Sequence, residues 1–162
     1  MGSLGRRALA VAILCSLTGA AVADGVRGPV TGLPLPRFVS LKASEANMRR
    51  GPSRSHRIDW ILRHRGMPLE VIAEFDNWRR VRDRDGAAGW VHYSLLSGAR
   101  SVVVTGGRVA LRTAPELTAE TVALAEEGVI ASLGDCNAAW CEVSADGYSG
   151  WVQRAVLWGA DN

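Results

Sequence analysis

Apolar and polar residues alternate along much of the chain. From Leu69 to Phe75 an apolar side chain stands at every second position, with Glu70 and Glu74 among the residues between them. This period of two is typical of β-strands that turn one face toward a core. β-branched and aromatic residues gather in short runs separated by Gly, Pro and Asp, and no stretch shows a convincing amphipathic helix. The pattern predicts an all-β protein of small, strongly bent barrels, with about five or six short strands in each unit of roughly sixty residues.

A seven-residue phrase occurs twice within this pattern. Residues 85–91 read DGAAGWV, and residues 146–152 read DGYSGWV, sixty-one positions later. In each phrase Asp-Gly favours a two-residue hairpin turn, because such turns need positive φ angles that these residues tolerate. The Gly-Trp-Val that follows predicts a strand whose Trp and Val point to opposite faces.

The residues around the phrase repeat as well. Trp78 aligns with Trp140, and the segment that begins at Asn47 aligns with the one that begins at Ala110, at offsets that drift from 63 to 61. Self-similarity at a nearly fixed spacing indicates duplicated units. The predicted organisation is a signal peptide (residues 1–23), a Pro-rich lead-in (24–37), module 1 (38–99) and module 2 (100–160).

The first residues have the order of an export signal. Arg6 and Arg7 precede an apolar run at residues 8–17, and small residues follow up to Ala23. This order is typical of a secretory signal peptide, with cleavage expected between Ala23 and Asp24. An apolar run of about ten residues is too short for a membrane-spanning helix, which needs about 20. We therefore expect a periplasmic or secreted protein without a stable membrane span.

The two halves of the chain carry opposite charge. Residues 24–100 hold 14 basic and 8 acidic side chains, a formal charge of +6, whereas residues 101–162 hold 3 basic and 8 acidic side chains, a formal charge of −5. The basic half favours an anionic surface or polymer as a partner. The alternatives are two solvated faces, or two modules that attract each other. Nucleic acid is not an expected partner, because an exported protein rarely meets it.

Two cysteines remain once the signal peptide is removed. Cys136 and Cys141 are separated by four residues, so in a hairpin they would face each other across the strands at a distance that a disulfide spans. An oxidising compartment favours such a structural disulfide. A redox motif would prefer Cys-x-x-Cys, and zinc would need two more ligands in a second half that has no histidine. No metal and no cofactor are predicted.

Three motifs taken together resemble the bacterial SH3-like (SH3b) domain. They are Asn-x-Arg-x-Gly-Pro from Asn47, Trp-x-x-Val from Trp78, and Asp-Gly-x-x-Gly-Trp-Val from Asp85. Residues 33–42 and 71–81 more closely resemble an exported, two-module SH3-like family of Alphaproteobacteria, whose function is uncharacterised.

The resemblance implies two tandem SH3-like barrels that work by binding. The leading ligand that it implies is cell-wall peptidoglycan or its stem peptides, and the alternative is an adaptor that docks an envelope protein. Module 2 departs from the pattern, with Ala110 and Ala114 where Asn47 and Gly51 stand in module 1. The first loops of the two modules are therefore not expected to be alike.

The resemblance also implies where a ligand binds. Trp78 and Trp140 open the strand that borders the ligand groove of SH3-type domains, and His92 follows the phrase beside the same groove. Trp60 could extend the groove of module 1. The arginines that suit the carboxylates of a wall peptide are Arg49, Arg50, Arg54, Arg79 and Arg80.

Other aromatic residues are assigned to packing. Trp90 and Trp151 follow the glycine of the repeated phrase and are predicted to cover the open side of each barrel. Trp158 has no counterpart in module 1, and it is predicted to pack between the modules.

The lead-in raises a separate hypothesis. The segment from Pro34 to Arg37 reads Pro-Leu-Pro-Arg, which resembles a polyproline ligand of SH3-type grooves and predicts docking onto a module of its own chain or a neighbour. The alternative is an extended lead-in to the first strand.

No catalytic site is predicted. The chain contains no Gly-x-Ser-x-Gly and no His-Glu-x-x-His. The glycines of the repeated phrase do not form a phosphate-binding loop, because such a loop also needs Lys-Ser/Thr at the start of a helix, and here a strand is expected.

Overall fold

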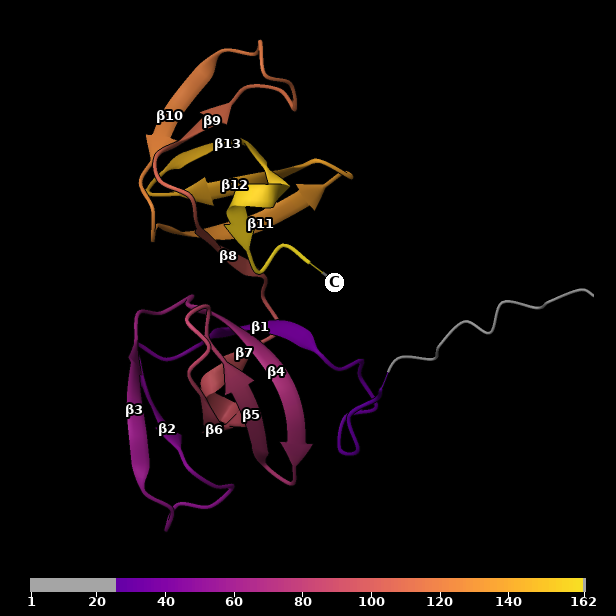
Figure 1. Cartoon of the computed structure of the whole chain (residues 1–162), viewed down its shortest axis with the longest axis vertical. Coiled ribbons are helices and arrows are strands. Elements are labelled where there is room, and N and C mark those ends of the chain that lie inside the picture. Colours follow the sequence, from indigo (N-terminus) through magenta and orange to yellow (C-terminus); the bar gives the residue numbers. More distant parts are fainter. Residues whose placement is uncertain (1–25, 162) are drawn as a thin grey trace, which may run out of the picture.

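A computed structural model describes residues 26–161. The predicted signal peptide and its cleavage point between Ala23 and Asp24 lie outside the described residues. The described part contains no α-helix and folds into two β-modules stacked along the long axis of the molecule (Figure 1). The prediction of an all-β protein with two tandem small barrels is confirmed.

Module 1 consists of one seven-stranded sheet with strand order β3-β2-β6-β5-β4-β1-β7. Its elements are β1 (Arg37–Leu41), β2 (Glu45–Arg49), β3 (Ile58–Arg63), β4 (Pro68–Phe75), β5 (Trp78–Arg82), β6 (Ala88–His92), the 3-10 helix η1 (Tyr93–Leu95) and β7 (Leu96–Ser97).

Module 2 repeats this topology strand for strand, with order β10-β9-β13-β12-β11-β8-β14. Its elements are β8 (Ser101–Val104), β9 (Val109–Arg112), β10 (Thr121–Ala125), β11 (Ile130–Cys136), β12 (Trp140–Ala145), β13 (Tyr148–Gln153), the 3-10 helix η2 (Arg154–Val156) and β14 (Leu157–Trp158). Since each strand of module 2 has its counterpart in module 1, the repeat in the sequence is a repeat in structure.

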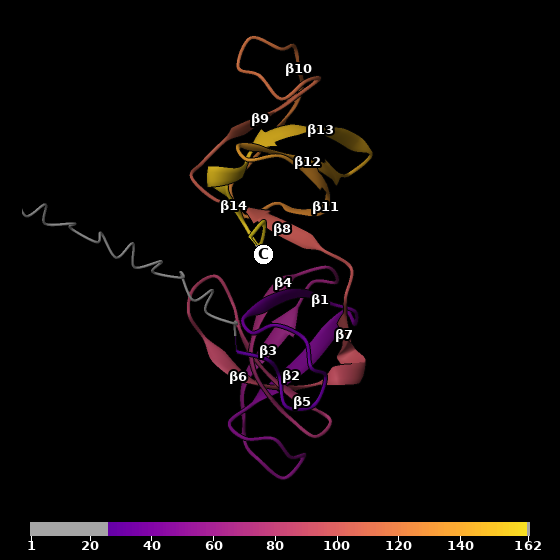
Figure 2. The same cartoon turned by 90° about the vertical axis from the view of Figure 1, so that its right-hand side faces the viewer.

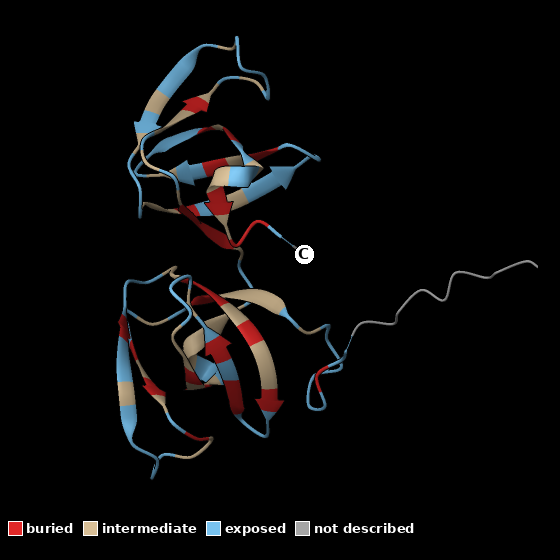
Figure 3. Ribbon diagram, viewed as in Figure 1, coloured by how far each residue is buried: buried red, intermediate tan, exposed pale blue. Residues whose placement is uncertain are grey.

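The alternating pattern places every second side chain inside a barrel. Leu69 and Val71 of β4, Val81 of β5 and Val91 of β6 are fully buried, and the red segments of Figure 3 mark such positions along the strands. Trp90, the neighbour of Val91, is only partly buried. The predicted opposite orientation of Trp and Val in the phrase is therefore observed, because successive residues of a strand face opposite sides.

The turns within the two copies of the phrase differ. In module 2, Asp146 and Gly147 alone join β12 to β13, with φ angles of 51° and 84°, as predicted for a two-residue hairpin. In module 1 the connection spans residues 83–87, and the Asp83 carboxylate accepts hydrogen bonds from the backbone N–H groups of Asp85 and Ala87 at 3.0 and 2.9 Å. The two-residue turn is thus wrong for module 1, because the Asp83 side chain organises a longer loop.

The predicted disulfide is present. Cys136 and Cys141 are cross-strand partners in β11 and β12, and their sulfur atoms are 2.02 Å apart. The same position of module 1 holds Glu74 opposite Arg79 in β4 and β5. One hairpin is therefore joined covalently where its copy carries an acid and a base.

Replacing both cysteines with serine will destabilise module 2 by about 2 kcal/mol, because the bond closes only a short loop. Amide hydrogen exchange should show faster opening of the β11–β12 hairpin in the variant and unchanged exchange in the β4–β5 hairpin of module 1, which serves as the internal control. Equal acceleration in both hairpins would contradict a local role for the disulfide.

A short connection between β7 and β8 joins the two modules (Figure 2). The Ser101 hydroxyl donates a hydrogen bond to the carbonyl of Gly66 in module 1. Trp158 packs edge-on against Phe38, with ring centroids 5.0 Å apart and an interplanar angle of 87°. The prediction that Trp158 packs between the modules is confirmed.

Candidate functional site

Three side chains form a row across the outside of module 1. Trp90 of β6 is the cross-strand partner of Arg49 in β2 and of Arg80 in β5. Directly paired residues of antiparallel strands carry their side chains on the same face of the sheet. Met48, which precedes Arg49, and Val91, which follows Trp90, are fully buried. Since successive residues of a strand face opposite sides, the row faces away from the core.

The row continues toward one end of the strands. Trp78 and His92 are also cross-strand partners and lie two residues from Arg80 and Trp90 respectively, hence on the same face. Their rings meet edge to face, with centroids 5.4 Å apart. We call these five residues (Arg49, Trp78, Arg80, Trp90 and His92) the outer face of module 1; Trp78 itself is only 9% exposed, so the accessible part of the face lies toward Arg80 and Trp90.

Sequence reasoning found four members of the outer face and missed Trp90, which it assigned to packing. Trp90 is only partly buried, and it stands between Arg49 and Arg80 on the neighbouring strands. The hairpin that joins β5 to β6 decides which residue of β5 lies beside Trp90. Only a correct length for the loop between β5 and β6 would have shown that Arg80 lies beside Trp90.

Module 2 carries the same face with a different charge. Trp151 is paired with Arg112 and with Glu142, so a carboxylate stands where Arg80 stands in module 1. Trp140 is paired with Gln153, as Trp78 is with His92. A cavity of about 280 Å³ adjoins this face, lined in part by Arg112, Trp140 and Gln153.

Arg49 and Arg112 have a structural role that both copies share. Arg49 Nη1 donates a hydrogen bond to the carbonyl of His56 at 2.8 Å. In module 2, Arg112 Nη1 donates a hydrogen bond to the carbonyl of Ala119, also at 2.8 Å. Each arginine therefore ties down the loop after its strand. The cation that distinguishes module 1 from module 2 is Arg80, which is exposed.

Arg50 lies in the first loop beside another carboxylate. Its Nε donates to Asp59 at 3.2 Å, and Arg57 holds the other carboxylate oxygen at 2.7 Å. The hydrogen bond from Arg57 is the largest influence that lowers the pKa of Asp59, and Arg50 adds to it. The exposed Arg50 is thus part of a small ion-pair cluster at the edge of module 1.

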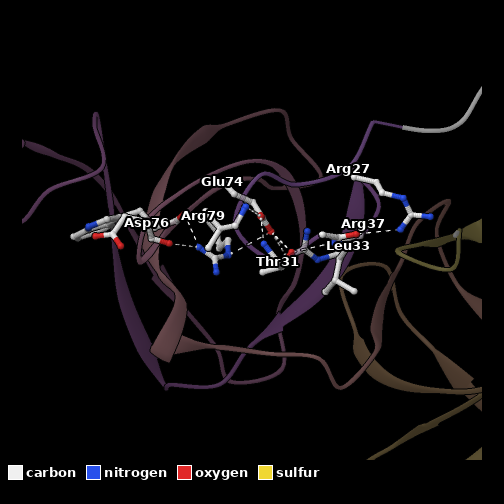
Figure 4. Close-up of polar contacts among 10 residues, drawn as sticks. Arg27, Thr31, Leu33, Arg37, Glu74, Asp76 and Arg79 are labelled. Carbon is white, nitrogen blue, oxygen red and sulfur yellow. Dashed lines mark hydrogen bonds and ion pairs between the residues drawn. The ribbon is translucent and has the colours of Figure 1, made fainter.

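Glu74 is the most strongly held carboxylate of module 1 (Figure 4). Its side chain is fully buried and accepts hydrogen bonds from the backbone N–H groups of Val30 and Thr31 at 3.0 and 2.9 Å, the Thr31 hydroxyl at 2.6 Å and the Arg37 guanidinium at 2.7 Å. Burial acts to raise the pKa of Glu74, but the hydrogen bonds from Thr31, Arg37 and Val30 outweigh it and lower the pKa to about 2. The carboxylate is therefore charged at neutral pH.

Arg79 belongs to this buried cluster. Its Nε lies 3.6 Å from Glu74, and its Nη1 donates to the carbonyls of Asp76 and Trp78 at 2.8 and 2.9 Å. Only 8% of Arg79 is exposed. Because adjacent residues of β5 face opposite sides, Arg79 turns toward Glu74 while Arg80 turns toward solvent. A ligand role for Arg79 stays a prediction, and its charge is already matched.

The lead-in lies against its own module 1. Residues 26–35 form a tight hairpin, in which Gly28 N–H donates to the Leu33 carbonyl at 2.8 Å and Leu35 N–H donates to the Val26 carbonyl at 2.7 Å. Its tip, at Val30 and Thr31, binds Glu74. Of the segment from Pro34 to Arg37, Pro34 forms an antiparallel β-bridge with Arg27, and Arg37 makes the ion pair with Glu74 as part of β1. The lead-in therefore contacts module 1 through a hairpin whose tip donates hydrogen bonds to the Glu74 carboxylate, and it does not lie in a groove as a polyproline helix.

Trp60 lies away from the outer face. It stands in β3, which is the edge strand of the sheet, and 57% of it is exposed. The groove extension predicted for Trp60 stays a prediction; the structure places its side chain beside a cavity between the modules.

The described part lacks both a membrane-spanning helix and a cluster of metal-binding side chains. Between residues 26 and 161 no helix is long and apolar enough to cross a membrane. Within the same range no three or more His, Cys, Asp or Glu side chains are grouped so that they could hold a metal ion.

The fold is that of a tandem small-barrel protein of the SH3 type. The chain belongs to the bacterial SH3 domain family, whose pattern matches residues 42–98 and again residues 105–159. The two matches fall on the two sheets described above.

Comparison with curated protein sequences gives no match. Among solved structures, NlpC2 from Trichomonas vaginalis is 12% identical with a TM-score of 0.35, over 76% of this chain and 48% of that one. An NlpC/P60 family protein from Bacillus cereus ATCC 10987 is 12% identical with a TM-score of 0.34, over 75% of this chain and 55% of that one. This chain thus spans about half the length of the structures that it matches, and likenesses at this level carry no argument about function.

Proposed function

We propose that this chain is a non-catalytic binding protein of the bacterial envelope that recognises carboxylates of peptidoglycan stem peptides on the outer face of module 1. The observation that carries the proposal is the exposed Arg80 beside Trp90, at a position where module 2 has Glu142. The membership in the bacterial SH3 domain family and the predicted export signal support it.

The chemistry of the outer face suits a peptide with a free carboxylate. A guanidinium can donate two parallel hydrogen bonds to a carboxylate, and bonds to charged groups contribute about 1.5–3 kcal/mol each. The indole of Trp90 offers an apolar surface beside that cation for the peptide backbone or an alanine methyl group. The formal charge of +6 over residues 24–100 favours the approach of an anionic polymer.

The test is co-sedimentation of purified residues 24–162 with isolated sacculi. We expect binding that weakens as salt is raised, and at least about a tenfold loss of affinity for Arg80→Glu, since about 1.4 kcal/mol corresponds to a factor of ten. Arg65→Glu is the matched control, because it makes the same change of charge at an exposed turn of module 1 outside the outer face. Equal losses in both variants, or no loss in either, would overturn a specific site at Arg80.

A second candidate function is that of an adaptor for an envelope protein. β10 is an edge strand of module 2, and its Val122 and Leu124 are 43% and 59% exposed beside a cavity of about 380 Å³. An edge strand with exposed apolar side chains can pair with a strand of another protein. An adaptor predicts no sedimentation with sacculi, together with one specific protein crosslinked from a photoreactive residue at position 124.

A further inference from the structure

A cavity of about 360 Å³ lies between the two modules. Module 1 contributes the end of β3 and the 83–87 loop, and module 2 contributes residues of β8, β11 and β14. Its volume lies within the range of small-molecule sites, which is about 300–1,000 Å³. It is separate from the outer face of module 1, since the two share no residue.

Two tryptophans from different modules border this cavity. Trp60 of module 1 is 57% exposed, and its neighbour Ile61 is 47% exposed. Trp158 of module 2 is held in place by its edge-on contact with Phe38. The cavity thus offers a fixed aromatic wall and an accessible one.

Trp60 is not needed to build the barrel. Trp60 of β3 is the cross-strand partner of Met48 in β2. At the corresponding position of module 2, Ala123 of β10 is the partner of Leu111 in β9. The copy of the module that folds with an alanine shows that the position does not require a large aromatic side chain. An exposed tryptophan at such a position points to a ligand more than to packing.

The rim of the cavity carries both hydrogen-bond donors and hydrogen-bond acceptors. Arg63, His64 and Arg84 provide donors, and the exposed Asp85 provides an acceptor. Arg84 lies 3.5 Å from Asp85 and 4.0 Å from Glu127, so its charge is matched on the protein. A ligand with a net charge would therefore meet like charges as well as opposite ones, whereas hydroxyl groups can both donate and accept.

We propose that this inter-module cavity binds a neutral saccharide of one or two pyranose rings, with the apolar face of one ring stacked on Trp60. A sugar ring combines an apolar face with hydroxyl groups at its edge, which matches an aromatic wall with a mixed polar rim. That the saccharide comes from the glycan strands of the cell wall rests on the proposed function; the saccharide site itself does not.

The test is a titration of ¹⁵N-labelled residues 24–162 with N,N′-diacetylchitobiose, followed by NMR. We expect the largest shifts at the Trp60 indole N–H and at the backbone amides of His64 and Ile130, which come from both modules. Trp60→Ala should weaken binding at least about tenfold, and Trp60→Phe should weaken it less, because a smaller aromatic face remains. Since Trp60 is mostly exposed, both variants should keep the dispersed spectrum of the folded protein.

Ile58→Ala is the matched control, because Ile58 is 40% exposed on the same strand but does not border the cavity. The proposal is overturned by an absence of shifts at millimolar disaccharide, by binding that Trp60→Ala leaves intact, or by shifts at Trp60 that the apolar tripeptide Leu-Leu-Leu produces and the disaccharide does not. Because the disaccharide carries no carboxylate, a negative result for Arg80 in the sacculus assay leaves this site standing.

Discussion

Replacing Glu74 with glutamine will destabilise module 1 by about 3 kcal/mol at pH 7. The substitution keeps the size of a fully buried side chain but removes the charge that faces Arg37 and Arg79, at 2.7 and 3.6 Å. Removing one partner of a buried ion pair leaves the other charges buried without compensation, which typically costs about 3–5 kcal/mol. The lowered pKa leads to a similar figure, because the difference between about 2 and the ordinary 4.5 corresponds to about 3 kcal/mol.

The same carboxylate makes the stability of module 1 dependent on pH in acid. The pKa of Glu74 is lower in the folded state than in the unfolded state, so the unfolded chain binds more protons between these two values. The contribution is therefore complete above about pH 4.5 and is lost as the pH falls toward 2. Glu74→Gln should lose this part of the acid dependence.

Amide hydrogen exchange of β4 and β5 at pH 7 measures the expected loss, and urea unfolding between pH 5 and 2 measures the acid dependence. Glu45→Gln is the matched control, because Glu45 has the same side chain in the same module, is 58% exposed and lies 3.6 Å from Arg63. An exposed pair of this kind contributes at most about 1 kcal/mol. A Glu74 variant that unfolds like the control would refute the role of the buried cluster.

Gly150→Ala will destabilise module 2 by about 3 kcal/mol. A Cβ at this position would lie 2.9 Å from Cβ of Leu111 and 3.0 Å from the carbonyl oxygen of Arg112, both fixed by strand β9. Overpacking of this kind typically costs about 1–3 kcal/mol, and the upper end applies here because no flexible side chain can move aside. The second glycine of the repeated phrase is therefore required for the close approach of β13 to β9.

Gly98→Ala provides the control, because a Cβ there meets no atom within 4 Å. We expect it to change stability by less than about 0.5 kcal/mol. Thermal unfolding followed with hydrogen exchange in β9 and β13 separates the two variants. If Gly150→Ala proves as stable as Gly98→Ala, the close approach of the strands does not explain the glycine.

The two modules stabilise the same hairpin by different chemistry. Module 2 joins β11 to β12 through Cys136 and Cys141, whereas module 1 places Glu74 and Arg79 at the corresponding positions and adds the lead-in hairpin through Thr31. The sequence repeat aligns these pairs at an offset of 62 residues. The pairing of Glu74 with Arg79 could thus have been predicted from the disulfide of the other copy.

The candidate site was predictable in part. The resemblance to SH3-type domains identified Trp78, Arg80, Arg49 and His92, which the structure brings together on the outer face of module 1. It also grouped Arg79 with Arg80, although the period of two in a strand separates them. The docking of Val30 and Thr31 onto Glu74 had no signal in the sequence, because residues 43 and 44 positions apart meet only through the path of the lead-in.

The sequence by itself determined the all-β class, the two modules, the disulfide and the opposite orientation of Trp90 and Val91. These features depend on local spacing, since a period of two, a repeated motif and a pair of cysteines in one hairpin are each visible within a few residues. Only the tertiary structure decided that Arg80 stands beside Trp90, that Arg79 forms an ion pair with the buried Glu74, and that Trp60 and Trp158 border one cavity. These relations depend on strand register and on how the modules pack, and both are set by contacts between residues far apart in the chain.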